Sequence, residues 1–255
     1  MAVVITITNH KGGVGKTTSA ANIAAGMHAQ GLRVLLIDLD PQANLSQSFG
    51  ISDPEADVYR MIRGEQDLAA TEIQDGLDIL PATLELAGAE VELSAEPGRE
   101  YILRELLEPA QKIYDVLIVD TPPSLGLLTI NALAAADYVY IPMQAEYLAM
   151  QGLTRLQGVL DKVRARLNKG LQLGGIFITR HNPRKVLSRE IVERIAQIYG
   201  DKLLPFHISD SVAVAEAPAK GMDLFRYAPA KKASQEYLDL SARIAKDIGV
   251  IKHTR

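Results

Sequence analysis

The sequence predicts an α/β protein with a central, mostly parallel twisted sheet that is covered by helices on both faces. Short apolar runs such as RVLLID (residues 33–38) and DVLIVD (residues 115–120) alternate with longer helical stretches. Nearly continuous apolar strands separated by helices are typical of a parallel sheet buried on both sides. A glycine-rich stretch at residues 11–18 follows the first apolar run and precedes a helical segment.

The first unit of this fold has the order strand, loop, helix, strand. Residues 3–8 form a β-branched run, and the Ala-rich residues 16–30 suit a helix that Gly31 ends. Residues 33–38 then form a second buried strand. Such a βαβ unit implies two parallel strands joined by a right-handed crossover.

The rest of the chain continues the alternation of strands and helices. Strands are predicted at residues 77–80, 115–120, 138–141, 173–179 and 203–207. Helices are predicted at residues 83–94, 100–112, 125–136, 147–168, 186–199 and 231–248. No linker, repeat or low-complexity stretch divides the 255 residues, so we expect residues 1–255 to form one domain.

The composition disfavours several classes of protein. The chain has no run of eighteen apolar residues, so no membrane span is expected. Its first ten residues, MAVVITITNH, lack the basic region of a signal peptide and read as a first strand. The chain has 0 cysteines, which excludes disulfides and thiolate metal sites and favours an intracellular, cytoplasmic setting.

Charge is distributed unevenly along the chain. Residues 1–150 hold 8 Lys+Arg against 21 Asp+Glu, whereas residues 151–255 hold 19 against 10. The basic excess of the second part suggests a face that binds a polyanion. Solvated helix surfaces explain the same charges equally well.

The glycine-rich stretch KGGVGKTT has the residues of a phosphate-binding loop. Glycines without a Cβ allow successive N–H groups to point at phosphate oxygens, and the following helix adds positive potential at its N-terminus. Lys16 would reach the β- and γ-phosphates, and the Thr17 hydroxyl would ligate Mg²⁺. His10 stands where the G-x-x-x-x-G-K-[ST] pattern begins with glycine. The candidate nucleotide contacts are Lys11, Gly12, Gly13, Val14, Gly15, Lys16, Thr17 and Thr18.

KGGVGKTT, with Lys11 at its start, resembles the deviant Walker A motif of the ParA/MinD ATPases. The resemblance continues in DLDPQANLS (residues 38–46), LAGAEVEL (86–93), LIVDTPPSLGLLTINAL (117–133), EAPAKG (216–221) and YAPAKKASQEYLDL (227–240). It spans nearly the whole chain, and the spacing is similar to that of ParA/Soj partition proteins. The resemblance implies a P-loop NTPase fold, ATP and Mg²⁺ as ligands, and ATP hydrolysis.

The resemblance also implies roles for individual residues. Lys11 matches the lysine that crosses a dimer interface to the partner's phosphates, which makes each site incomplete alone; a solvated lysine is the alternative. Asp120 matches the Walker B acid, and residues 121–123 match switch II. Asp40 matches the switch I residue that helps to position the attacking water, although it could instead cap a helix before Pro41. Asp38 is a candidate for supporting Mg²⁺ or the switch geometry.

The adenine and DNA contacts are the least specific of these implications. The segments that hold the base match residues 179–182 and 207–210, which makes Asn182 and Asp210 candidates, although turn formation explains both equally well. ParA-like ATP dimers bind DNA without sequence preference through Lys and Arg. The candidates are Arg180, Arg184, Lys185, Lys220, Arg226, Lys231 and Lys232. Residues 209–213 lack the arginines that many relatives carry there.

Two functions remain open at this point. The first is a partition or cargo-positioning ATPase that is a nucleoid-associated homodimer with ATP and is activated by a ParB-like or cargo adaptor protein. The second is a regulatory ATP switch that acts on a protein partner without DNA. A MinD-like membrane role is disfavoured because the tail KDIGVIKHTR has few bulky apolar groups. Iron–sulfur reductases need cysteines, and ligases of the dethiobiotin synthetase type lack the LAGAEVEL and EAPAKG segments.

Overall fold

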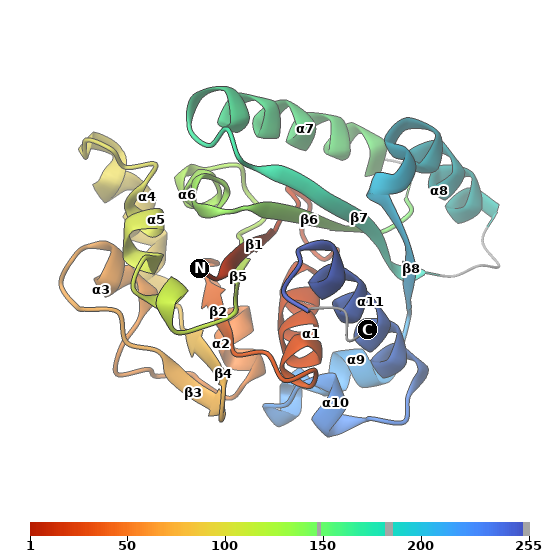
Figure 1. Ribbon diagram of the computed structural model, residues 1–255, viewed down its shortest axis with the longest axis horizontal. Helices are drawn as coiled ribbons and strands as arrows, with labels where there is room; N and C mark the ends of the chain where they lie inside the picture. The colour runs from red at the N-terminus through yellow and green to blue at the C-terminus, as the bar shows by residue number, and fades with distance from the viewer. Residues whose placement is uncertain (147–148, 182–185, 252–255) are drawn as a thin grey trace.

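A computed structural model describes residues 1–146, 149–181 and 186–251. Its centre is an eight-stranded sheet with the order β3-β4-β2-β5-β1-β6-β7-β8 (Figure 1). All neighbouring strands are parallel except β3, which runs antiparallel to β4. The strands are β1 (Val3–Ile7), β2 (Val34–Asp38), β3 (Thr71–Gln74), β4 (Leu77–Leu80), β5 (Val116–Asp120), β6 (Tyr138–Met143), β7 (Gln172–His181) and β8 (Leu203–Ser209).

The register of the central strands determines where the polar residues meet. Ile7 of β1 pairs with Asp120 of β5, and Asp38 of β2 pairs with the same aspartate. The five residues of β2 and of β5 are all buried. Because the strands are parallel, their carboxyl ends and the loops that follow them gather at one edge of the sheet.

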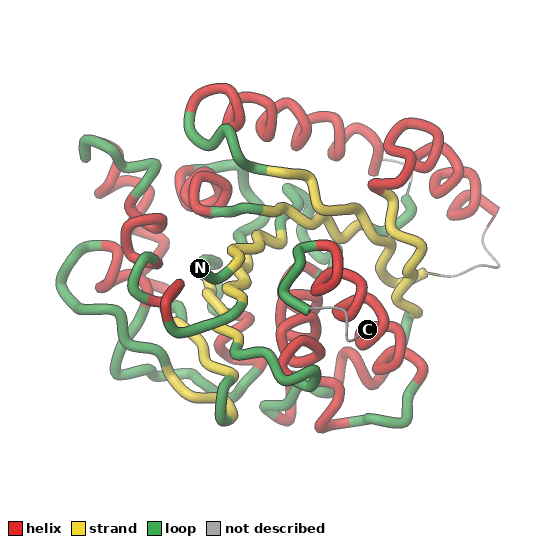
Figure 2. The backbone as a smooth tube through the Cα atoms, in the orientation of Figure 1, coloured by secondary structure: helices red, strands yellow, loops and turns green. Residues whose placement is uncertain are grey.

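Helices cover both faces of the sheet (Figures 1 and 2). The α-helices are α1 (Lys16–His28), α2 (Asn44–Ser48), α3 (Val58–Ile62), α4 (Ala89–Glu92), α5 (Ile102–Leu107), α6 (Leu127–Ala135), α7 (Ala149–Arg166), α8 (Val186–Tyr199), α9 (Val212–Glu216), α10 (Leu224–Tyr227) and α11 (Lys232–Asp247). Short 3₁₀ helices are η1 (Leu84–Gly88), η2 (Leu93–Ala95), η3 (Ala110–Lys112), η4 (Gly200–Lys202) and η5 (Pro218–Lys220).

Two hydrophobic cores lie on opposite faces of the sheet. Helices α3 to α8 contribute to one core, and α1, α2 and α9 to α11 contribute to the other. Helix α1 packs against α11, where Ser19 Oγ lies 3.3 Å from the buried Tyr237 hydroxyl. The helix that follows the glycine-rich loop is therefore held from both sides, by the sheet and by α11.

The predicted α/β fold is confirmed, with three differences in detail. The segment 83–94 is not one helix but the series η1, α4 and η2. The segment 100–112 is divided into α5 and η3 around Pro109, since proline interrupts a helix. Strand β3 was not predicted, and it forms a hairpin with β4 through Gly76, whose φ is 86°.

Membrane-spanning character was sought in the helices of the described ranges. None of them is both long and apolar enough to cross a membrane.

Candidate functional site

The glycine-rich loop joins β1 to α1 at the carboxyl edge of the sheet. Gly13 and Gly15 have φ values of 73° and 85°, in the left-handed region that favours glycine. Two side chains fix the loop: Gln144 Nε2 donates to the Gly13 carbonyl at 2.7 Å, and Thr179 Oγ1 donates to the Val14 carbonyl at 2.8 Å. No side chain caps the N-terminus of α1. Its first N–H groups are thus left for an anionic ligand.

Lys16 begins α1 and has a buried side chain whose Nζ lies 3.4 Å from the Lys11 carbonyl oxygen. Burial lowers the pKa of this lysine, whereas the carboxylates of Asp120 and Asp40 raise it. The ammonium is consequently held among acidic groups at the start of the helix, with no printed salt bridge to either of them. This position suits a cation that contacts a phosphate group.

Asp120, at the end of β5, is fully buried, and neither of its carboxylate oxygens has a hydrogen-bond partner among the described residues. Burial is the largest cause that raises its pKa well above the usual range, and Asp38 adds to it. The neighbouring Thr17 hydroxyl and Lys16 lower the pKa in part. A buried carboxylate without a partner beside a hydroxyl fits a site for a divalent cation with oxygen ligands. Thr17 and Asp120 are thus the residues that would hold Mg²⁺.

Asp38 has a different set of contacts, because its oxygens accept hydrogen bonds from the chain itself. Oδ2 accepts from the Ser46 amide at 2.9 Å and from Ser46 Oγ at 2.7 Å, and Oδ1 accepts from the Asp40 amide at 3.1 Å. Burial raises the pKa of Asp38 to about 6, while these donors lower it. In this state Asp38 anchors the segment that leads into α2, and its role toward Mg²⁺ stays a prediction.

Asp40 follows at the rim of the same edge and lines the cleft. Its Oδ1 accepts from the Gln42 amide at 3.0 Å, which is a local turn, and Ala43 rather than Asp40 is the N-cap of α2. The second carboxylate oxygen is not engaged in a hydrogen bond within the described chain. Asp40 therefore supports the turn and still presents an oxygen to the cleft.

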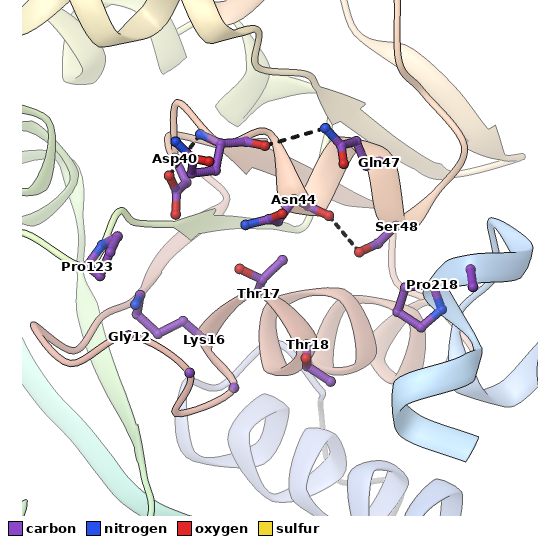
Figure 3. Close-up of a pocket in the computed structure, with 14 residues that line it drawn as sticks. Gly12, Lys16, Thr17, Thr18, Asp40, Asn44, Gln47, Ser48, Pro123 and Pro218 are labelled. Carbon is purple, nitrogen blue, oxygen red and sulfur yellow. Dashed lines mark hydrogen bonds between the residues drawn. The ribbon is translucent and has the colours of Figure 1, made fainter. Parts of the chain in front are cut away.

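These elements enclose a cleft of about 620 Å³, which is large enough for a nucleotide. Figure 3 shows Lys16 and Thr17 on the α1 side of the cleft and Asp40 and Asn44 on the opposite side. The sequence analysis did not identify several of the lining residues, although all lie in or beside the DLDPQANLS and EAPAKG segments. These residues are Gln42, Asn44, Gln47, Ser48, Pro218 and Ala219.

Lys11 does not line this cleft. Its ammonium forms an ion pair with Glu146, and the two side chains are 39% and 52% exposed. Lys11 is therefore the one lysine of KGGVGKTT that points away from the cleft of its own chain and remains open to solvent.

Three residues proposed for the base or DNA, Asn182, Arg184 and Lys185, lie outside the described residues. Asp210 does not line the cleft of the phosphate loop. It forms an ion pair with Arg180 at 3.3 Å and lines a separate pocket of about 280 Å³. Its contact with adenine stays a prediction.

The other DNA candidates lie in the C-terminal part of the chain and differ in their contacts. Arg226 pairs with the buried Asp223, which caps α10, and Lys232 pairs with Glu236 at 3.0 Å. Lys220 and Lys231 are exposed and form no ion pair with a described residue. Salt bridges occupy part of the basic excess, and these two lysines are the most accessible cations of the set.

Comparisons with known proteins agree with this site. The family model described as "AAA domain" matches residues 2–173. The chain is 41% identical to the sporulation initiation inhibitor protein Soj of Bacillus subtilis, over 96% of this chain and 99% of that protein. It is 40% identical to the chromosome partitioning protein ParA of Caulobacter vibrioides, over 94% of this chain and 93% of that protein.

Two solved structures have a similar fold. A plasmid partition protein from Borrelia burgdorferi matches with a TM-score of 0.77 and 28% identity, over 96% of this chain and 98% of that one. Cobyrinic acid a,c-diamide synthase from Mycobacterium smegmatis, crystallised with an ATP analog and magnesium, matches with a TM-score of 0.85 and 34% identity. That match covers 95% of this chain and 93% of the synthase.

Proposed function

Because this chain belongs to the ParA/Soj family of partition ATPases, we propose that it works as an ATP-gated homodimer that binds DNA without sequence preference. The dimer drives the segregation or positioning of DNA or of another cargo. A ParB-like or cargo adaptor protein stimulates hydrolysis, and the protein is associated with the nucleoid in its ATP state.

The position of Lys11 carries this proposal. Lys16 of the same loop is buried in the cleft, whereas Lys11 is half-exposed on the outside and pairs with Glu146. A lysine that cannot serve its own cleft in this arrangement is placed to serve the cleft of a second subunit. Phosphoryl transfer needs positive charge around the transferred group, and an added cation of this kind is worth roughly 10³–10⁵ in rate. Hydrolysis would then wait for the dimer.

The other groups of the site have separable tasks. The loop amides and Lys16 bind the phosphates, while Thr17 and Asp120 hold Mg²⁺, which neutralises phosphate charge when it is bound. Asp40 presents its free carboxylate oxygen to the cleft, where it can orient a water molecule. Asp38 and Ser46 keep Asp40 in place through the bonds described above.

The basic second part of the chain supports DNA as the ligand of the dimer. Lys220 and Lys231 are exposed and available for phosphate contacts. Binding through such contacts is independent of sequence and weakens steeply as salt rises, because neutralised phosphates release counterions. Doubling the surface in a dimer doubles the number of contacts, which links DNA binding to ATP.

DNA retention by the Asp40→Ala protein tests the proposal. Retention is measured with ATP, with ADP and without nucleotide, at low and at moderate salt. We expect retention only with ATP, and its loss as salt rises. The variant that also carries Lys16→Ala is the matched control, because it should not retain DNA in any state.

A failure to retain DNA would have a defined meaning. If the Asp40→Ala protein forms an ATP dimer but does not hold DNA at either salt concentration, partition by DNA binding is contradicted. The chain would then act as a regulatory ATP switch on a protein partner.

A further inference from the structure

The N-terminus of α6 lies against a carboxylate from a distant part of the chain. Glu90, on α4, accepts a hydrogen bond from the Leu128 amide with Oε1 at 3.3 Å. The two residues are 38 positions apart in the sequence. Helix N-termini expose unpaired amides and a positive potential, so a carboxylate at this place is favourable.

Gly126, the N-cap of α6, shows how closely Glu90 approaches. A Cβ built on this glycine would lie 2.1 Å from Glu90 Oε1, a distance that real Cβ atoms do not show. The φ of Gly126 is −80°, which any residue adopts. The glycine is thus needed for the carboxylate that packs on it and not for its own backbone conformation.

The first turn of α6 is also tied to the segment that enters the cleft. Thr129 Oγ1 donates to the Ser124 carbonyl at 2.7 Å, and the neighbouring Pro123 lines the cleft. At the other end of the segment, Thr121 Oγ1 donates to the Ile7 carbonyl at 3.1 Å. Residues 121–125 are therefore suspended between the end of β5 and the first turn of α6.

Glu90 itself is fixed by apolar packing on either side. Leu86, Ala89 and Leu93 are buried in the same core as Leu128. The two neighbouring acids differ in their contacts, because Glu92 faces outward and binds the Tyr59 hydroxyl and Arg63. Glu90 is the acid of this segment that reaches the turn behind the cleft.

We propose that Glu90 is a positioning residue for ATP hydrolysis, which holds the first turn of α6 and through it the residues 121–125 at the cleft. The inference rests on the proposed role of those residues as a switch segment. It assigns to the LAGAEVEL segment a task in the reaction: it sets the back of the switch from outside the nucleotide site. A change at Glu90 should affect the chemical step more than the binding of ATP.

Steady-state ATP hydrolysis by Glu90→Ala, Glu90→Gln and the unchanged protein tests this role, in the absence of DNA and of any activator. We expect kcat of Glu90→Ala to fall by about 10- to 100-fold, because small misplacements of reacting groups cost that much, while KM changes by about twofold or less. Glu90→Gln keeps an oxygen acceptor for the Leu128 amide, so it should retain most of the kcat. The thermal midpoint of each variant is measured in parallel.

Gly126→Ala tests the same contact from the other side. Its methyl group displaces the Glu90 carboxylate, so the kcat should fall as in Glu90→Ala. Because both changes break one contact, the double variant should lose no more than either single variant. Glu92→Gln, on the same segment, is the matched control and should keep the kcat of the unchanged protein.

An unchanged kcat in folded Glu90→Ala would overturn the proposal, and so would additive losses in the double variant. A lowered thermal midpoint with normal kcat below that midpoint would show a structural cap only, which also overturns it. The assay needs neither DNA nor a partner protein. A failure of the DNA-partition proposal therefore leaves this result interpretable.

Discussion

Ser46→Ala should destabilise the fold at the point where three elements meet the cleft. The Ser46 side chain is fully buried, donates to Asp38 Oδ2 at 2.7 Å and accepts from the Ala82 amide at 3.0 Å. The hydroxyl thus joins the end of β2 and the start of α2 to the chain that follows β4. Alanine removes both bonds and offers no replacement in a site that water does not reach.

The magnitude follows from the two bonds. A hydrogen bond to a charged group contributes about 1.5–3 kcal/mol, and a buried amide without an acceptor costs about 1–3 kcal/mol. The two terms share one hydroxyl and are not additive, so we expect the free energy of unfolding to fall by about 3 kcal/mol. Asp38 is ionised above its pKa of about 6, and the full effect applies at higher pH.

Urea unfolding followed by far-ultraviolet circular dichroism, without nucleotide and well above that pKa, measures the loss. Ser48→Ala is the control, because its hydroxyl donates only to the Asn44 carbonyl at the helix surface. This variant should stay within about 0.5 kcal/mol of the unchanged protein. A loss below about 1 kcal/mol for Ser46→Ala would refute the view that Ser46 and Asp38 anchor this segment.

Three further predictions concern the reaction and DNA. Lys11→Ala should lower ATP hydrolysis by roughly 10³-fold or more with little effect on ADP binding, whereas Lys16→Ala should weaken nucleotide binding itself; normal hydrolysis by Lys11→Ala would contradict a role in trans. Asp40→Ala should accumulate as an ATP dimer in light scattering, and a monomer with saturating ATP would count against its switch role. Lys231→Glu with Lys232→Glu should reduce ATP-dependent DNA retention and the salt slope by about 2, one for each lost phosphate contact, and leave ATP binding intact. An unchanged affinity would remove both lysines from the DNA face.

Much of the fold and of the phosphate loop could be predicted from the sequence because the signals are local. Apolar strands such as residues 116–120 are buried over their whole length, as their composition indicates. The ends of β2 and β5 carry Asp38 and Asp120, and parallel pairing brings them to one edge without further information. The glycines of the loop have the positive φ values that their place in the motif requires.

Other features depend on contacts between distant residues and have no local signal. Lys11 meets Glu146 across 135 positions, and the sequence could not show that this lysine leaves its own cleft. The segment 83–94 has apolar residues at helical spacing, yet the packing of Leu86 and Leu93 divides it into short turns. The hairpin turn at Asp75 and Gly76 was a readable signal, since such a pair favours a tight turn between strands.

The central claim is that a second subunit completes each site through Lys11. Its most direct test is the rate of ATP hydrolysis per subunit, measured against total protein concentration with the mass in solution followed in parallel. The claim predicts a rate per subunit that rises with concentration as the dimer forms and then levels off, and a low, flat response for Lys11→Ala. A constant rate per subunit across concentrations at which the protein is a monomer would contradict it.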